Sequence, residues 1–97
     1  MQYFIAGIEM EFFLPAVQSL KEKRALRQRL TERLQNRFSL SILECGEQDN
    51  LARLQLAAAL LCSGEGKARD AGRAVLRAAE EIAGGEAELI HYAVDVY

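Results

Sequence analysis

The residues whose types and spacing most clearly suggest a function form a basic run between positions 21 and 37. The run reads KEKRALRQRLTERLQNR and holds seven of the twelve lysines and arginines against two glutamates. It therefore carries a formal charge of +5, whereas the rest of the chain carries −7. A charge separation of this size in a small protein is typical of a surface that meets an anionic partner. The seven cations are Lys21, Lys23, Arg24, Arg27, Arg29, Arg33 and Arg37.

Five of these cations are the candidate nucleic-acid-binding residues. Cations in the first turn of a helix oppose the helix dipole, so helix formation does not explain why they stand there. The same first turn leaves backbone N–H groups free, which suits a phosphate. An ordinary solvated helix face is the alternative. Because the net charge is −2, any nucleic-acid contact must be local, and we expect RNA and no DNA. The five candidates are Lys21, Lys23, Arg24, Arg27 and Arg29.

An acidic group near the middle of the chain could bind a divalent cation. Glu44, Glu47 and Asp49 lie within six residues of one another. A metal site needs several oxygen ligands that converge, which a single turn rarely supplies. Turn formation by itself accounts for Asp49. We therefore expect no metal at this turn.

The remaining reactive side chains form no recognisable catalytic set. Cys45 and Cys62 stand seventeen positions apart in a chain with a single histidine, so no metal-ligand spacing is present. We expect two buried thiols in a reducing compartment and a solvent-exposed His91 without an obvious partner. No phosphate-binding glycine loop or nucleophile with an adjacent base stands out. The sequence predicts neither catalysis nor a cofactor.

The basic run must sit on a helix that follows a strand. Residues 2–13 alternate apolar and mixed positions, which predicts a strand, and Pro15 ends it. Ser19 and Glu22 have the spacing of a capping box, in which each side chain accepts the other's backbone N–H. The helix that starts there is expected to end near Asn36. Its apolar stripe consists of Leu26, Leu30 and Leu34.

The middle of the chain contains one ambiguous segment. Residues 39–45 alternate as a strand does, and a turn follows at 46–50. Residues 52–62 are rich in alanine and leucine, which favours a helix. Their apolar side chains also recur at every second position, as in a central strand. The residues by themselves leave both readings open.

A second helix and a last strand complete the chain. Ser63 is the expected cap of a helix that runs to about Ala83, where Gly84 and Gly85 end it. Residues 87–97 then alternate as a strand, with Ile90, Tyr92, Val94 and Val96 on one face. If 52–62 is also a strand, the order is β-α-β-β-α-β. The sequence then predicts a single α+β domain over residues 1–97. This is the ferredoxin-like sandwich, with two helices on one face of a four-stranded antiparallel sheet.

Several short strings together resemble the YlxP-like family of small bacterial proteins, a family of unknown function. The resemblance implies the ferredoxin-like fold and therefore a strand at 52–62. Members are typically encoded among translation factors, beside a small-subunit ribosome-binding factor, which is an association of genes and not a mechanism. The strings are SLKEKRAL at 19–26, NRFSLS at 36–41, Glu44, and the Gln48-Asp49 turn with Arg53.

Two positions depart from the family pattern. Leu51 stands where the family usually has a tryptophan after the turn, so a contact made by that ring is lost or weakened. Arg27 stands where an apolar residue is common, so it adds a charge at the margin of the helix's apolar stripe.

Three functions remain open from the sequence. The outward residues of the third strand include no aromatic side chain for stacking bases, so RNA or the ribosome would be bound through the basic helix. The alternative is a protein-interaction module, a homodimer for example, that uses the open sheet face around Leu61 and Ala93 or the edge of the last strand. A weaker third is a regulator that binds a small ligand or metal at the acidic turn. The outward residues of the third strand are Arg53, Gln55, Ala57 and Ala59.

The first residues predict the compartment. The segment MQYFIAGIEMEFFL has no basic leader and is interrupted by Glu9 and Glu11. It therefore has the pattern of neither a signal peptide nor a membrane span. We expect a cytoplasmic protein that does not contact membranes.

Overall fold

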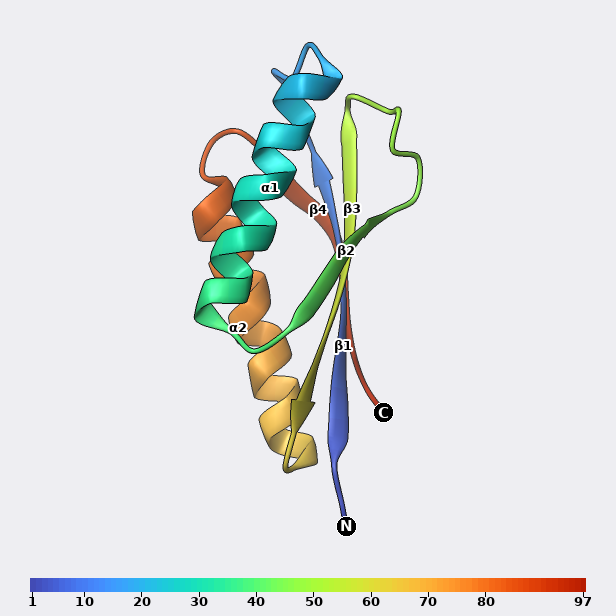
Figure 1. Ribbon diagram of the computed structural model, residues 1–97, viewed down its shortest axis with the longest axis vertical. Helices are drawn as coiled ribbons and strands as arrows, with labels where there is room; N and C mark the ends of the chain where they lie inside the picture. The colour runs from blue at the N-terminus through green and yellow to red at the C-terminus, as the bar shows by residue number, and fades with distance from the viewer.

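Two helices cover one face of a four-stranded antiparallel sheet in the computed structural model, which describes all 97 residues (Figure 1). The strand order is β2-β3-β1-β4, so β1 and β3 are central and β2 and β4 are edges. This arrangement confirms the predicted ferredoxin-like fold. The elements are β1 (Phe4–Phe13), α1 (Leu20–Arg37), β2 (Ser41–Cys45), β3 (Arg53–Cys62), α2 (Glu65–Ala83) and β4 (Glu88–Val96).

The ambiguous segment is strand β3. It pairs with β1 over ten residues, from Phe4 opposite Cys62 to Phe13 opposite Arg53. Alanine and leucine favour helices only weakly, and burial between two neighbouring strands overrides that preference. The alternation predicted the faces correctly, because Leu54, Leu56 and Ala58 are buried under the helices. They meet the buried leucines of α1, which are Leu26, Leu30 and Leu34.

The helix ends differ from the predictions in two details. Ser19 Oγ accepts the Glu22 N–H at 3.1 Å as expected, but the Glu22 carboxylate accepts the Gln18 N–H at 2.7 Å and not that of Ser19. The prediction that Ser63 caps α2 is wrong. Gly64 is the cap, and its backbone carbonyl accepts the Ala68 N–H, while the Ser63 hydroxyl accepts from Lys67.

Strand β4 contains an irregularity that the alternation pattern hides. The pairing of β1 with β4 shifts after Glu11, which lies opposite His91, so that Phe12 lies opposite Leu89. Leu89 therefore takes the helix-facing position that the sequence pattern assigned to Ile90. A β-bulge of this kind is an insertion in the pairing, and a simple period of two cannot reveal it.

The two layers of the fold carry opposite charge. The helices hold eleven cations against six anions, and all of the excess lies on α1. The sheet and the connecting segments hold one cation, Arg53, against eight anions. The charge split seen in the sequence is therefore a split between a basic helix layer and an acidic sheet layer. Neither helix is long and apolar enough to span a membrane.

Candidate functional site

Lys23, one of the five predicted contact residues, lies inside the protein. Its side chain is 3 % exposed, and its Nζ is 3.2 Å from Glu44 Oε2. The same ammonium donates to the backbone carbonyls of Gln48 at 3.0 Å and Asn50 at 2.9 Å, with that of Glu47 at 3.5 Å. An ammonium group has three protons, and these acceptors use all of them. In this position Lys23 holds the β2–β3 loop against α1 and is not accessible to a phosphate.

Glu44 joins β2 to the same helix. Its second oxygen, Oε1, accepts from Arg27 Nη1 at 3.1 Å, so two cations hold one largely buried carboxylate. The pairing gives a partner to the charge of Arg27, the residue that departs from the pattern of the resembling family. Glu44 is thereby separated from Glu47 and Asp49, which are exposed. The three acids do not converge as the idea of an acidic site required, and no group of three metal-ligating side chains is present.

Several of the residues that carry the family resemblance, from the 19–26 string, Glu44 and the Gln48-Asp49 turn, meet at this point. A shallow pocket of about 190 Å³ lies between the first half of α1 and the β2–β3 loop. Arg24 lines this pocket, and Lys21 lies three residues before it on α1. Both are exposed and make no ion pair, so they are the candidate contact residues that the fold leaves free. The pocket is lined by Leu20, Lys23, Arg24, Arg27, Glu44, Gln48 and Asp49.

Two of the remaining three cations of α1 pair with acids on the side of α2. Arg29 pairs with Glu86, in the loop after α2, and Arg37 lies 3.5 Å from Glu81 of α2. Arg33 is exposed and has no ion pair. The five predicted contact residues therefore do not form one patch. One is buried, two are paired on opposite sides of α1, and two are free.

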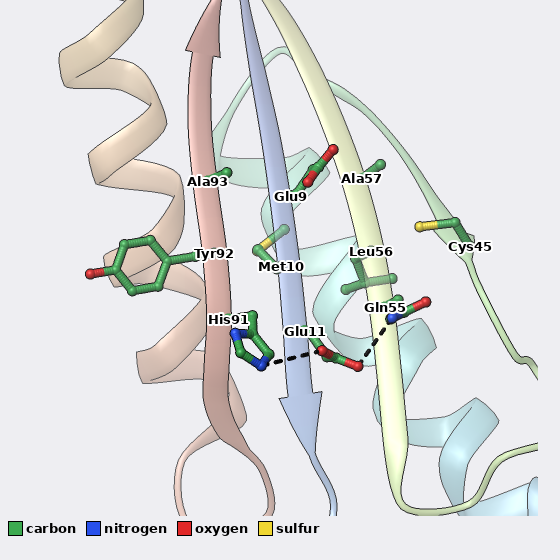
Figure 2. A pocket seen from close by; sticks show the side chains of 10 residues that line it. All are labelled: Glu9, Met10, Glu11, Cys45, Gln55, Leu56, Ala57, His91, Tyr92 and Ala93. Atoms are coloured by element: carbon green, nitrogen blue, oxygen red, sulfur yellow. Dashed lines mark hydrogen bonds and ion pairs between the residues drawn. The ribbon is translucent and has the colours of Figure 1, made fainter.

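The face of the sheet without helices contains a second candidate site (Figure 2). A cavity of about 350 Å³ spans the central strands there. Glu11 of β1 accepts from Gln55 Nε2 at 3.0 Å, and His91 Nε2 lies 4.0 Å from Glu11 Oε1. His91 is 78 % exposed, as expected, but the expectation that no possible partner stands beside it is wrong, because Glu11 does. Only the register of β1 with β4 brings these two side chains together, so the sequence contains no local signal for the contact.

Cys45 lies at the rim of this cavity and is exposed, so the prediction that both cysteines are buried is wrong for this residue. Its thiol is harder to ionise than usual. Partial burial, followed by the charges of Glu9 and Glu44, raises the pKa of Cys45. The thiolate is the reactive form, so a raised pKa means a smaller reactive fraction at a given pH. We expect iodoacetamide to alkylate Cys45 more slowly than free cysteine at pH 8, with the rate curve displaced to higher pH.

Mass spectrometry of the Cys45 peptide measures that rate separately from Cys62. Glu9→Gln removes one of the charges that raise the pKa and should speed the alkylation. Glu80→Gln changes charge equally on the far layer and serves as the control. A thiol that reacts as fast as free cysteine, or that ignores Glu9→Gln, would contradict this electrostatic account.

Comparison with known proteins identifies the family. The model of a family described as "Protein of unknown function (DUF503)" matches residues 5–94. The chain belongs to the DUF503 family. This DUF503 protein is also 42 % identical over 59 residues to the uncharacterized protein YlxP of Bacillus subtilis (strain 168). That alignment spans 61 % of this chain and 64 % of the relative's length. The resemblance to YlxP-like proteins is confirmed, and the family description gives no evidence of catalysis.

Solved structures resemble this DUF503 protein in fold only. The de novo designed protein Foldit4 has a TM-score of 0.52 at 13 % identity, covering 99 % of this chain and 97 % of its own. The designed protein Ferredog-Diesel has 0.52 at 14 %, covering 94 % and 83 %. A hydantoinase/carbamoylase family amidase from Burkholderia ambifaria has 0.52 at 8 %, covering 98 % of this chain and 28 % of the amidase. At these identities the likeness indicates architecture and no activity.

Proposed function

We propose that this DUF503 protein is a non-enzymatic, cytoplasmic binding protein that contacts structured RNA, such as ribosomal RNA, through the outer side of α1. The observation that supports this function is the pair of free cations at the start of α1. Lys21 and Arg24 are exposed without an ion pair, and Arg27 beside them stays 35 % exposed. Phosphate groups are bound by cations that are available in this way.

The buried ion pairs beneath Lys21 and Arg24 make these two cations more effective in binding phosphate. Glu44 is one of the acids that line the pocket under the patch, and Lys23 and Arg27 already pair with it. Lys23 also fixes the loop that borders Arg24 by holding its carbonyl groups. Lys21 and Arg24 therefore project from a rigid base, which lowers the entropy lost on binding. A contact of two or three phosphates by this patch is local, in agreement with the overall negative charge.

Co-sedimentation with ribosomal subunits tests the proposal. We expect the double variant Lys21→Glu/Arg24→Glu to bind at least about tenfold more weakly than the unchanged protein. With two to three phosphate contacts, raising the salt from about 50 to 200 mM should also weaken binding by the unchanged protein on the order of tenfold. The charge-reversed variant should lose most of this salt dependence.

The matched control is Lys67→Glu/Arg77→Glu. Both of these cations lie on α2, are exposed and have no ion pair, and the change of net charge is the same. This variant should bind subunits as the unchanged protein does. Equal losses in the two double variants would show a general charge effect, and no loss in either would reject the α1 surface.

A second candidate function is protein binding through the open sheet face. The observation that favours it is a group of large apolar side chains left uncovered there. Leu43, Leu61 and Tyr97 are 60 %, 70 % and 72 % exposed. Leu61 of β3 and Tyr97, directly after β4, flank Ile5 of β1. An exposed apolar patch of this kind commonly marks an interaction site.

A further inference from the structure

The open sheet face combines an apolar surface with negative charge. Strand pairing places Leu43, Ala57, Glu9 and Ala93 in one row across the four strands. The next row consists of Cys45, Gln55, Glu11 and His91. On the other side of the first row lie Ser41, Ala59, Gly7 and Asp95. The face therefore has small residues in its middle, large apolar ones toward its edges and two glutamates along β1.

The charge of this face is unbalanced. Glu9, Glu11, Glu88 and Asp95 lie on it or at its border, against the single permanent cation Arg53. Glu9 is exposed and has no ion pair, although it stands on a central strand. A nucleic acid would be repelled by these carboxylates. The occupant of the face must bring positive charge.

A second copy of the chain is a poor occupant for the same reason. In a two-fold dimer through this face, the same patch would meet itself. The unpaired Glu9 near the centre of one copy would then approach Glu9 of the other, in an interface from which water is displaced. Like charges facing each other in an interface cost several kcal/mol. The electrostatics therefore favour a different partner over self-association.

The shape of the face suits a helix. Ala57 and Ala93 flank Glu9 with short side chains, while Leu43 at one side is large and exposed. The cavity of about 350 Å³ is lined by Ala57, Ala93 and other residues of β1, β3 and β4, which Figure 2 labels. The uncovered face of a sheet is commonly buried by a helix with an apolar stripe.

We propose that the open sheet face binds an amphipathic helix of another protein that carries lysine or arginine. Its apolar stripe packs on the alanines and on Leu43, and its cations meet Glu9 and Glu11. This inference gives the partner chemistry of the second candidate function. It does not depend on RNA binding, because the two surfaces lie on opposite layers of the molecule.

Fluorescence polarisation with a short labelled helical peptide built only from leucine and lysine tests the proposal. The leucines occupy one helical stripe, and a second peptide has glutamate in place of every lysine. We expect the lysine peptide to bind and the glutamate peptide not to bind. Glu9→Lys and Leu43→Asp should each weaken binding at least tenfold. Both residues are exposed, and circular dichroism checks that the variants fold.

The matched control is Glu80→Lys, which makes the same charge change at an exposed, unpaired glutamate on α2. It should leave the affinity unchanged, as should Lys21→Glu/Arg24→Glu, so this test is separate from the RNA test. Equal losses in Glu9→Lys and Glu80→Lys, or no loss in Glu9→Lys, would overturn the proposal. Light scattering that shows a dimer abolished by Leu43→Asp, with no peptide binding, would assign the face to a second copy instead.

Discussion

Lys23→Met should lower the free energy of unfolding by about 3 to 5 kcal/mol, because it breaks a buried ion pair and leaves part of it without a partner. Methionine has nearly the shape of lysine and keeps the packing of the side chain. What it removes is the charge opposite Glu44 and the donor for the Gln48 and Asn50 carbonyl groups. Arg27 still donates to one oxygen of Glu44, which limits the loss of stability.

Urea unfolding followed by circular dichroism measures this effect. Lys21→Met is the matched control, since Lys21 is exposed two positions away on the same helix and should change stability by about 0.5 kcal/mol or less. In the Glu44→Gln background, Lys23→Met should cost less than it does alone, because the buried carboxylate is no longer charged. The melting temperature of Lys23→Met should fall by more than about 10 °C.

The result also decides between two roles for Lys23. A Lys23→Met protein that is as stable as Lys21→Met but binds ribosomal subunits poorly would show that Lys23 leaves its buried site to contact RNA. The sequence-based prediction for this residue would then hold against the structure. A large loss of stability with Lys21 and Arg24 still supporting binding assigns Lys23 to the fold.

Gly72→Ala should be destabilising by about 1 to 3 kcal/mol, although alanine normally strengthens a helix by about 1 kcal/mol over glycine. Gly72 lies in the middle of α2, where the helix passes close to β4. A Cβ at this position would be 2.4 Å from Val94 Cγ1 and 3.1 Å from Val94 Cγ2. Valine is branched at Cβ and cannot swing away, so either α2 or β4 must shift.

A double-mutant cycle with Val94→Ala checks the cause. In the Val94→Ala background the contacting methyl groups are absent, so Gly72→Ala should become neutral or stabilising. Gly66→Ala is a useful comparison on the same helix, since a Cβ there meets nothing within 4 Å and should increase stability. If Gly72→Ala is stabilising in the unchanged protein, the close approach of α2 to β4 is wrong.

Sequence periodicity predicted both helices and three of the four strands because burial follows it directly. Residues 52–62 by themselves fit a helix or a strand, and only the family resemblance favours the strand. Residues of β1 alternate between buried and exposed sides as expected, and the three predicted leucines of α1 are buried. The errors lie where an interaction is not periodic. Ser63 has the right chemistry for a cap, yet the chain enters α2 one residue later at Gly64. Ile90 fits the alternation, yet the bulge gives its place to Leu89.

The sequence by itself determined the two helices, three of the four strands, their core faces and the presence of a basic helix on an acidic protein. Those properties depend on local pattern and on composition, and both can be read directly from the sequence. Only the tertiary structure decided which cations are available. Lys23 and Lys21 are nearly neighbours in the chain, but Lys23 meets Glu44 and the loop that follows it, whereas Lys21 faces solvent. A charge is free or neutralised according to the partner that folding brings from a distant segment, and no local pattern contains that information.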